Sequence, residues 1–268
     1  VFGLITAEFL PASLLTPMAA SLGVSEGMAG QAVTATALVA LVTGLLITPA
    51  TKSIDRRWVL MFFSVLQIIS SLLVAFAPTL HVLLMGRLLL GVAIGGFWAM
   101  STATTMRLVP ADKVPKALAV IFSRVSIATV VAAPLGSYLG SLIGWRNVFI
   151  LCILPSMLAL LWQLWVLPSM KPESSGSLST LFRVLRRPGM IGGMLATILI
   201  FSGHFAFFTY LRPFLETVGQ ANVETISLIL LGFGLANFAG TSVAGHLLAR
   251  NLRLTLALVP FAMGILAL

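Results

Sequence analysis

Long apolar runs separated by short polar stretches make up most of the sequence. A helix that crosses a membrane needs about 20 mainly apolar residues, and the runs match that length. We expect a first helix that ends near Leu22, further helices at 28–50, 58–77, 80–106, 116–142, 145–167, 190–211 and 225–248, and a ninth that begins near Leu254. Because a helix satisfies its own backbone hydrogen bonds in lipid, the pattern predicts an all-α membrane protein.

The stretch from residue 168 to 187 interrupts this pattern. It is polar, basic and rich in Ser and Pro, which is typical of a linker. We therefore expect an amino-terminal bundle of six helices at 1–167, a cytoplasmic linker at 168–187 and the start of a second bundle at 188–268. Two halves built from repeated helices are common in secondary transporters, whose substrate binds between the halves near the middle of the membrane.

Composition and charge support the membrane assignment. Hydrophobic residues make up 59% of the 268 residues and charged residues 9%, whereas soluble domains carry about 25% charged residues. The net charge of +9 reflects topology rather than nucleic-acid binding, because twelve of the 16 basic residues fall in loops on one side of the membrane. These twelve are Lys52, Arg56, Arg57, Arg107, Lys113, Lys116, Lys171, Arg183, Arg186, Arg187, Arg250 and Arg253. That side is expected to be cytoplasmic, and with it the amino terminus.

Few polar residues remain inside the expected spans. Arg146 and Arg212 fall in loops on the side opposite the linker, so the arginines within spans are Arg87 and Arg124. Arg124 either faces a cavity or extends to the cytoplasmic surface, as long basic side chains can. Charged residues at membrane depth normally face a bundle interior or a water-filled cavity.

Glu8 is the most informative of these residues. It lies about 20 Å before the end of the first helix, near the middle of the membrane, and Pro11 and Pro17 follow it, so we expect the helix to bend there. Burial raises the pKa of a carboxyl group and a nearby arginine lowers it. A group between these influences can bind and release a proton, which favours a role in proton or substrate transport over a static ion pair between helices.

Arg87 and several aromatic residues are further candidates. Arg87, Gly91, Gly95 and Trp98 recur at helical spacing, and we interpret the glycines as packing positions and Arg87 as a cavity residue. His204, Phe207 and Phe208 share one stripe of a later helix. Such a stripe more often faces lipid or packs than binds a ligand, although the histidine favours a lined cavity unless it is hydrogen-bonded between helices.

Motifs of enzymes are lacking in the sequence. There is no metal-ligand spacing, nucleophile elbow or nucleotide-binding loop, so we expect neither an enzyme nor a cofactor, and an ion gradient would have to supply energy for transport. The single cysteine, Cys152, excludes a disulfide framework within the chain.

Four stretches in order resemble the major facilitator superfamily, in its branch of drug/proton antiporters. They are AEFLPASLLTPMA, with Glu8; TPATKSIDRRWVL, with Lys52, Asp55, Arg56 and Arg57 in the cytoplasmic loop motif; GRLLLGVAIGG, with Arg87; and AAPLGSYLGSLIGWRNVF, with Ala133, Pro134, Gly136 and Gly140 in the antiporter motif. The resemblance implies alternating access, with Glu8 and Arg87 in proton coupling, and a fold of twelve helices, of which this chain would hold eight to nine. We expect a monomer, because nothing in the sequence demands more than one copy.

The stretches GGFWAMS, TMRLVP, VPKALAVIF and FAFFTYLRP are similar to those of bacterial purine ribonucleoside exporters. That resemblance implies a protein of the bacterial inner membrane that exports inosine-like nucleosides and purine analogues in exchange for protons. Trp98, Phe207 and Phe208 would then stack on the purine, His204 and Asn237 would supply hydrogen bonds, and Arg124 would be a further cavity residue.

The sequence departs from the family pattern at several positions. Lys52 stands where an aspartate is usual, Asp55 where a glycine is usual and Ala133 where a glycine precedes Pro134, while Arg124 replaces a small residue. The departures at Lys52 and Asp55 change the charges on which the family's relay in this cytoplasmic loop depends. The alternatives for function are a broader drug or sugar exporter of the same branch, a membrane sensor that has lost transport, and a channel.

Overall fold

The structure is a computed structural model that describes residues 1–171, 183, 185–251, 254, 258, 261 and 262. Most of the expected linker and of the expected ninth helix lies outside the described residues. So do the side chains of a few residues within helices, including Arg250.

The described part of the chain consists of helices joined by short loops and turns. Its α-helices are α1 (Phe2–Ser13), α2 (Leu15–Leu22), α3 (Glu26–Ala50), α4 (Arg56–Ala75), α5 (Leu80–Leu108), α6 (Val114–Ile143), α7 (Trp145–Leu151), α8 (Ile153–Val166), α10 (Met190–Thr217) and α11 (Val223–Arg250). A 3-10 helix, η1 (Ala111–Lys113), precedes α6. These bounds agree with the expected spans to within a few residues at most helix ends.

The first expected span is a bent pair of helices. α1 and α2 meet at Leu14 and their axes differ by 66°. Pro11 lies inside α1, and Pro17 lies in the first turn of α2. Proline has no N–H to donate and its ring crowds the preceding turn, so the expected bend is confirmed. The sixth span likewise divides into α7 and α8 at Cys152, three residues before Pro155.

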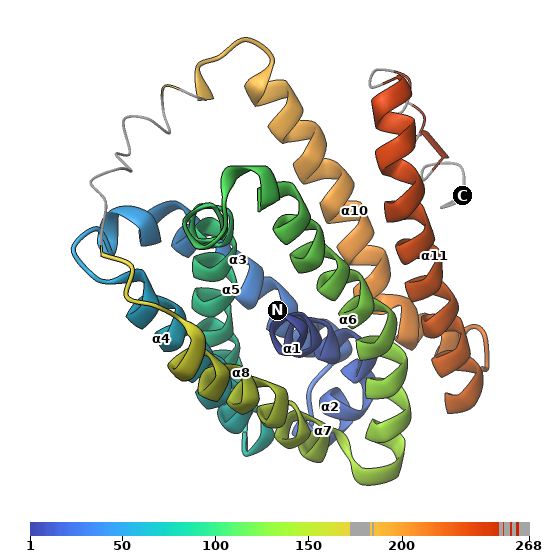
Figure 1. Cartoon of the computed structure of the whole chain (residues 1–268). Helices are drawn as coiled ribbons and strands as arrows, with labels where there is room; N and C mark the ends of the chain where they lie inside the picture. The colour runs from blue at the N-terminus through green and yellow to red at the C-terminus, as the bar shows by residue number, and fades with distance from the viewer. Residues whose placement is uncertain (172–182, 184, 252–253, 255–257, 259–260, 263–268) are drawn as a thin grey trace.

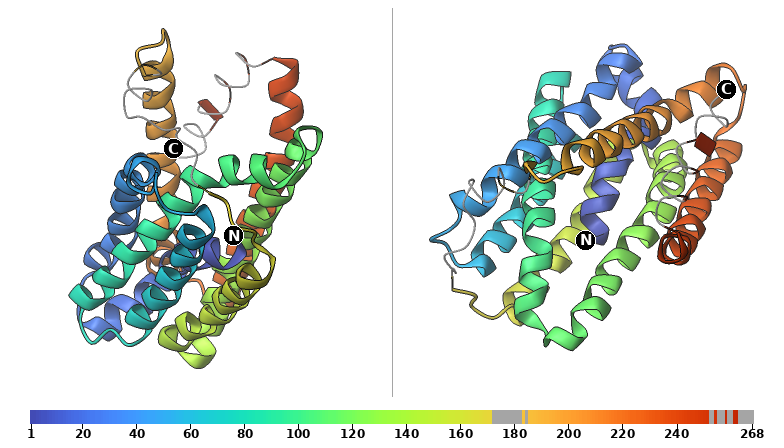
Figure 2. Two further views of the ribbon diagram at one scale, coloured as in Figure 1. Left: turned by 60° about the vertical axis from the view of Figure 1, so that its left-hand side comes forward. Right: turned by 90° about the horizontal axis from the view of Figure 1, so that it is seen from above.

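Helices α1 to α8 form one bundle, and α10 and α11 stand beside it (Figure 1). The strongest packing inside the bundle joins α3 to α5 and α4 to α5, while α10 and α11 reach it through α1, α2, α3 and α6. Parts of α10 and α11 project beyond the bundle (Figure 2). We call the end with the loops at 51–55 and 109–113 and with residues 167–171 the linker end, and the opposite end the far end.

Close packing between α3 and α5 explains the glycines that follow Arg87. A Cβ at Gly91 would lie 2.6 Å from the carbonyl oxygen of Thr36, and a Cβ at Gly95 would overlap the backbone of Ala40. The glycines therefore let the two backbones touch, as the packing interpretation predicts.

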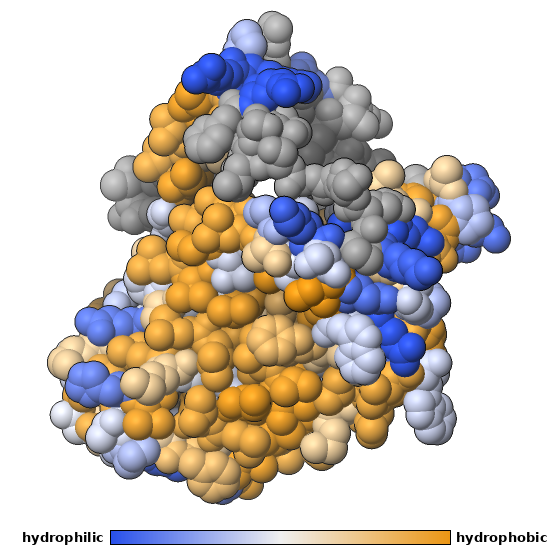
Figure 3. Space-filling view, turned by 90° about the vertical axis from the view of Figure 1, so that its left-hand side faces the viewer, coloured by the Kyte–Doolittle hydropathy of each residue, from blue (hydrophilic) through white to orange (hydrophobic). Residues whose placement is uncertain are grey.

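The surface of the described helices is mostly apolar. Seven of these helical segments are long and apolar enough to cross a membrane, or eight if α1 and α2 count as one span. Figure 3 shows a broad apolar surface with polar residues gathered toward its edges. Exposed apolar residues in a continuous surface of this extent indicate contact with lipid rather than water.

The prediction for Arg212 was wrong. Helix α10 continues through Pro213 to Thr217, six residues beyond the expected end, so Arg212 lies within the helix and not in a loop. Its side chain is buried at 5% exposure. A single Pro does not end a helix when its neighbours satisfy the freed carbonyl, and the sequence pattern alone placed the boundary too early.

Candidate functional site at the bend of the first helix

Arg87 lies at the centre of the amino-terminal bundle, with 1% of its surface exposed. Its guanidinium donates hydrogen bonds to three backbone carbonyls: Nη1 to Ala7 at 2.8 Å, Nε to Ala32 at 3.1 Å and Nη2 to Glu8 at 3.3 Å. Thr36 on α3 donates in turn to the carbonyl of Arg87 at 3.3 Å. Arg87 thus joins α5 to both α1 and α3.

The proline at position 11 explains why Ala7 can accept this bond. In an α-helix the carbonyl of residue 7 would accept from the N–H of residue 11, but Pro11 has no N–H. Ala7 would therefore present an unpaired carbonyl in the protein interior, which is costly. The guanidinium of Arg87 donates to this carbonyl in place of the missing N–H. The charge-assisted hydrogen bonds that it forms compensate for the loss of its hydration.

Glu8 follows the freed carbonyl directly. The structure contains no ion pair between the Glu8 carboxylate and the Arg87 guanidinium, both of which it describes, although the two charges interact through space. Arg87 instead holds the backbone of Glu8. A static ion pair between these two side chains is therefore not what connects their helices.

The antiporter motif of α6 packs against the bend between α1 and α2. A Cβ at Gly136 would lie 2.6 Å from the Leu10 side chain and 2.7 Å from the Ser13 hydroxyl, and one at Gly140 would overlap Leu14. Pro134 lies inside α6, two residues before Gly136, and its neighbour Ala133 is buried at 1% exposure. The motif therefore shapes the surface that receives the bend.

An aromatic cluster connects α1 with α10 and α11. Phe9, the residue after Glu8, meets Phe208 edge-on at 5.3 Å between ring centroids and stacks with Phe205 at 6.1 Å. Phe233 on α11 stacks with Phe208 at 5.2 Å and with His204 at 5.8 Å.

Two of the sequence candidates, His204 and Phe208, thus belong to this cluster. Phe207 is 57% exposed and touches the cluster only at its edge, at 6.4 Å from Phe233. Sequence reasoning missed Phe9, Phe205 and Phe233, although Phe9 adjoins Glu8 and Phe205 adjoins His204.

The remaining aromatic candidate, Trp98, lies elsewhere. Its ring stacks with Phe122 of α6 at 5.9 Å and meets Phe97 edge-on. Arg124 is exposed on α6, two residues from Phe122. Asn237 is exposed on α11 and has an interaction partner. The structure therefore does not bring all the sequence candidates into one site.

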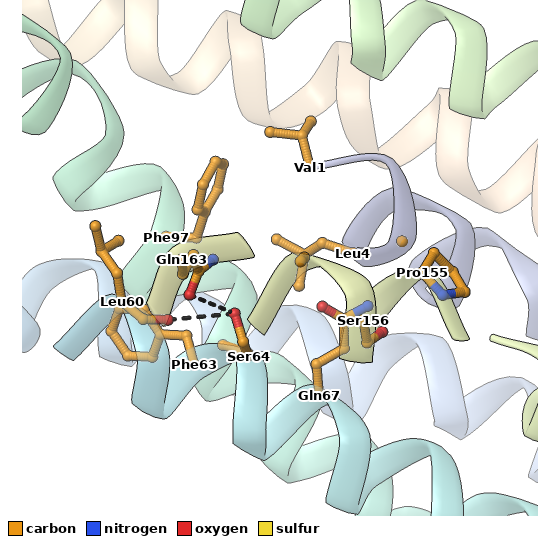
Figure 4. A pocket seen from close by; sticks show the side chains of 13 residues that line it. Val1, Leu4, Leu60, Phe63, Ser64, Gln67, Phe97, Pro155, Ser156 and Gln163 are labelled. Carbon is orange, nitrogen blue, oxygen red and sulfur yellow. Dashed lines mark hydrogen bonds between the residues drawn. The ribbon is translucent and has the colours of Figure 1, made fainter. Parts of the chain in front are cut away.

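A small polar cavity lies between α1, α4, α5 and α8 (Figure 4). Ser64 donates to the amide oxygen of Gln163 at 3.0 Å on one side, and the Gln67 amide nitrogen is buried there without a hydrogen-bond partner among the described residues. The cavity of about 50 Å³ has room for a water molecule, which needs roughly 10–15 Å³ of such volume, but not for a nucleoside-sized ligand.

The cytoplasmic loop motif lies at the linker end and binds the start of the linker. Asp55 caps α4 by accepting from the N–H of Arg57, and it also accepts from the Ser169 hydroxyl at 2.5 Å and the Met170 N–H at 2.9 Å. The Ser169 hydrogen bond is the main cause that lowers the pKa of Asp55; desolvation opposes it, and the hydrogen bonds from the N–H groups of Met170 and Arg57 lower the pKa further. Arg57 donates to the carbonyl of Leu164 at 2.7 Å, while Lys52 is exposed.

Among the described residues, no three His, Cys, Asp or Glu side chains are grouped so that they could hold a metal ion.

Comparison with known proteins defines the class. The sequence model of the Major Facilitator Superfamily matches residues 1–268. The chain is 52% identical over 265 residues to the purine ribonucleoside efflux pump NepI of Escherichia coli O1:K1 / APEC, and 51% identical to that of Salmonella paratyphi B (strain ATCC BAA-1250 / SPB7). Each alignment covers 99% of this chain and 67% of the relative.

Solved structures agree on the fold. A bacterial homologue of the human lysosomal transporter Spinster, in an inward-facing and unoccupied conformation, superposes with a TM-score of 0.78 at 16% identity, and the match covers 93% of this chain and 60% of that one. A D-xylose–proton symporter gives a TM-score of 0.69 at 19% identity, covering 93% and 67%. The chain is part of a multi-pass membrane transporter, and it belongs to the major facilitator superfamily.

Proposed function

We propose that the protein of which this chain is part exports purine ribonucleosides and purine analogues in exchange for protons, by alternating access. The relatives that are about half identical carry the name of purine ribonucleoside efflux pumps. The observation that carries the mechanism is the placement of Glu8 within α1, before the bend of the first span and beside a positive charge that is held by backbone carbonyls rather than by the carboxylate.

This arrangement gives Glu8 and Arg87 different tasks in proton coupling. The three partners of Arg87 are backbone carbonyls. They remain acceptors whether the Glu8 carboxyl group is ionised or protonated, so the position of the Arg87 charge does not depend on that carboxyl group. Glu8 is not tied up in an ion pair and is free to gain or lose a proton. The stationary charge favours the ionised carboxylate. The bonds of Arg87 to the backbone of α1 leave the Glu8 side chain unrestrained, so a change in the surroundings of the carboxyl group that buries it more deeply would favour protonation.

Substrate recognition is assigned to the aromatic cluster next to Glu8. Rings of Phe208 and Phe233 can stack on a purine, and His204 can form a hydrogen bond to it. Trp98 and Arg124, which both lie near Phe122, are assigned contacts with the substrate outside this cluster, as are Phe207 at the cluster's edge and Asn237 on α11. A purine ring stacked against this cluster would lie beside the turn of α1 that carries Glu8, which supports competition between substrate and proton.

The proposal includes the orientation of the molecule. Basic residues concentrate at the linker end, which we place in the cytoplasm of a bacterium, so that the chain lies in the inner membrane with its amino terminus cytoplasmic. The boundaries 1–167, 168–187 and 188–268 remain our division of the chain into bundle, linker and second bundle. A monomer suffices for this mechanism.

Uptake of labelled inosine into inside-out vesicles that contain the full-length protein tests the function. With an acid-inside gradient, we expect saturable accumulation that collapses when the gradient is dissipated. Accumulation of drugs or sugars but not inosine would favour the broader exporter. A protein that is inserted but transports none of them would support a non-transporting sensor, and flux without saturation or proton coupling would indicate a channel.

A further inference from the structure

We propose that Arg212 is a positioning residue that holds the two halves of the transporter together at the far end. It does so by binding a carbonyl of the first span that Pro17 leaves free. The proposal rests on alternating access, which belongs to the proposed function, but not on the identity of the substrate.

The contacts of Arg212 cross from one half to the other. Its Nη1 donates to the backbone carbonyl of Ser13, where α1 ends, and to the hydroxyl of Ser137 on α6 at 3.3 Å. Its Nε donates to Glu216 one turn further along α10, at 2.8 Å. Arg212 and Ser137 are 5% and 0% exposed. One buried guanidinium thus joins α10 to both α1 and α6.

The acceptor on α1 exists because of a proline. In a continuous helix the carbonyl of Ser13 would accept from the N–H of residue 17, and Pro17 has none. Arg212 supplies the missing donor from the other half of the molecule. A charge-assisted bond to a carbonyl that is otherwise unpaired is among the stronger interactions available inside a protein.

The surroundings of Arg212 close the far end between the halves. Leu211 and Phe208 of α10, together with Ile226 of α11, form a buried apolar cluster with Ala12 of α1 and Ala133 of α6. The linker half of α10, by contrast, is exposed along most of its length. The halves therefore meet near Arg212 and are apart toward the linker end.

Glu216 makes this contact reversible. When the far end opens, Arg212 must leave Ser13 and Ser137, because those residues belong to the other half. Glu216 lies on the same helix as Arg212 and moves with it, so the guanidinium keeps a charged partner in the open state. An arginine without that partner would be left as an unpaired charge, which is strongly unfavourable.

Labelling of a reporter cysteine tests the proposal in the full-length protein. Ile226→Cys, in a background without other cysteines, places the reporter in the buried cluster at the far end. A membrane-impermeant maleimide added from the periplasmic side reports how often that end is open. We expect Arg212→Gln to raise the labelling rate about tenfold or more, because a charged hydrogen bond to a buried acceptor is lost.

Two further variants separate the mechanism from misfolding. Pro17→Ala returns an N–H to the Ser13 carbonyl and should raise labelling without removing any charge. Ser137→Ala removes one acceptor and should raise it by about two- to fivefold. Arg146→Gln is the matched control, since Arg146 donates to Ser21 and to the carbonyl of Ala77, both in the amino-terminal half.

Unchanged labelling in Arg212→Gln and Pro17→Ala, in proteins that are shown to be inserted and monodisperse, would overturn the proposal. An equal increase in Arg146→Gln would also overturn it, because general loosening would then explain the effect. The readout needs no substrate, so it stands apart from a failure of inosine transport.

Discussion

The Arg87 guanidinium donates a 2.8 Å hydrogen bond to the carbonyl of Ala7, the acceptor that Pro11 leaves without its helical partner. The pair fixes α5 against the first span at the position where Glu8 follows. A backbone bond of this kind does not depend on the protonation state of the carboxylate. It therefore suits a residue whose charge must remain in place while Glu8 changes its own.

Replacing Pro11 with Ala tests this relationship. The new N–H would bind the Ala7 carbonyl within the helix and compete with Arg87, so we expect proton-driven accumulation to fall about three- to tenfold, corresponding to roughly 1 kcal/mol. Initial rates in vesicles, normalised to the amount of inserted protein, measure the effect. Pro49→Ala is the control, because Pro49 lies inside α3 near exposed residues; an equal loss there would contradict the specific role of Pro11.

The aromatic cluster predicts that two phenylalanines, Phe233 and Phe207, differ in how much they contribute to the affinity for substrate. Phe233→Ala removes a ring that stacks with both His204 and Phe208, and we expect the apparent affinity for inosine to weaken about three- to tenfold. Phe207→Ala should change it by less than about twofold, because Phe207 is mostly exposed. Inhibition of labelled inosine exchange by unlabelled inosine gives both values. A larger loss of affinity in Phe207→Ala than in Phe233→Ala would contradict this assignment and place the binding site at the exposed Phe207.

Asp55 is expected to stabilise the linker end through its cap and its bonds to the start of the linker. Asp55→Ala loses both and should lower the melting temperature of the purified protein, with a cost of about 1 kcal/mol for the cap alone. Asp55→Asn keeps the cap but weakens the acceptor for Ser169 and Met170, so its melting temperature should be intermediate. If Asp55→Asn matched Asp55→Ala, the cap would contribute nothing.

The direction of the Asp55 pKa shift sets the pH dependence of this contribution. The folded pKa lies below the unfolded value, so the stabilisation is present above the unfolded pKa of about 3.9 and is lost as the pH falls through the folded value. The difference in melting temperature between the wild type and Asp55→Ala should therefore be constant between about pH 6 and 8. A difference that changed within that range would require another titrating group.

Packing between α3 and α5 gives a prediction about stability. A Cβ at Gly95 would overlap the backbone of Ala40, so Gly95→Ala should destabilise the protein by about 1–3 kcal/mol, visible as a lower melting temperature. Gly192 lies in α10 with open space at its Cβ position. Gly192→Ala should leave stability unchanged or raise it slightly, and a similar loss in both variants would contradict the packing account.

The sequence predicted the helices well because length and apolar composition decide a membrane span. It also predicted the bend of the first span, since proline acts locally through its missing N–H. It could not show that Ala7 and Ser13 would receive their donors from Arg87 and Arg212, because those contacts join residues about 80 and 199 positions apart. Local pattern contains no information about such pairings.

The aromatic residues show the same limit. His204 and Phe208 share a helical stripe, so periodicity identifies them together. Phe9 on α1 and Phe233 on α11 belong to the same cluster. Their membership follows only from the packing of these two helices against α10, which the sequence does not show. Trp98 has the right chemistry but lies against Phe122 in another part of the bundle.

The most direct test of the central claim compares two activities of Glu8→Gln in vesicles that contain the full-length protein. The account predicts that this variant still exchanges internal for external inosine when no gradient is imposed, because a neutral side chain of the same shape leaves the binding surface and the carbonyl partners of Arg87 intact. It should not accumulate more inosine with an acid-inside gradient than without one. Full uphill accumulation by Glu8→Gln would contradict the assignment of proton coupling to Glu8.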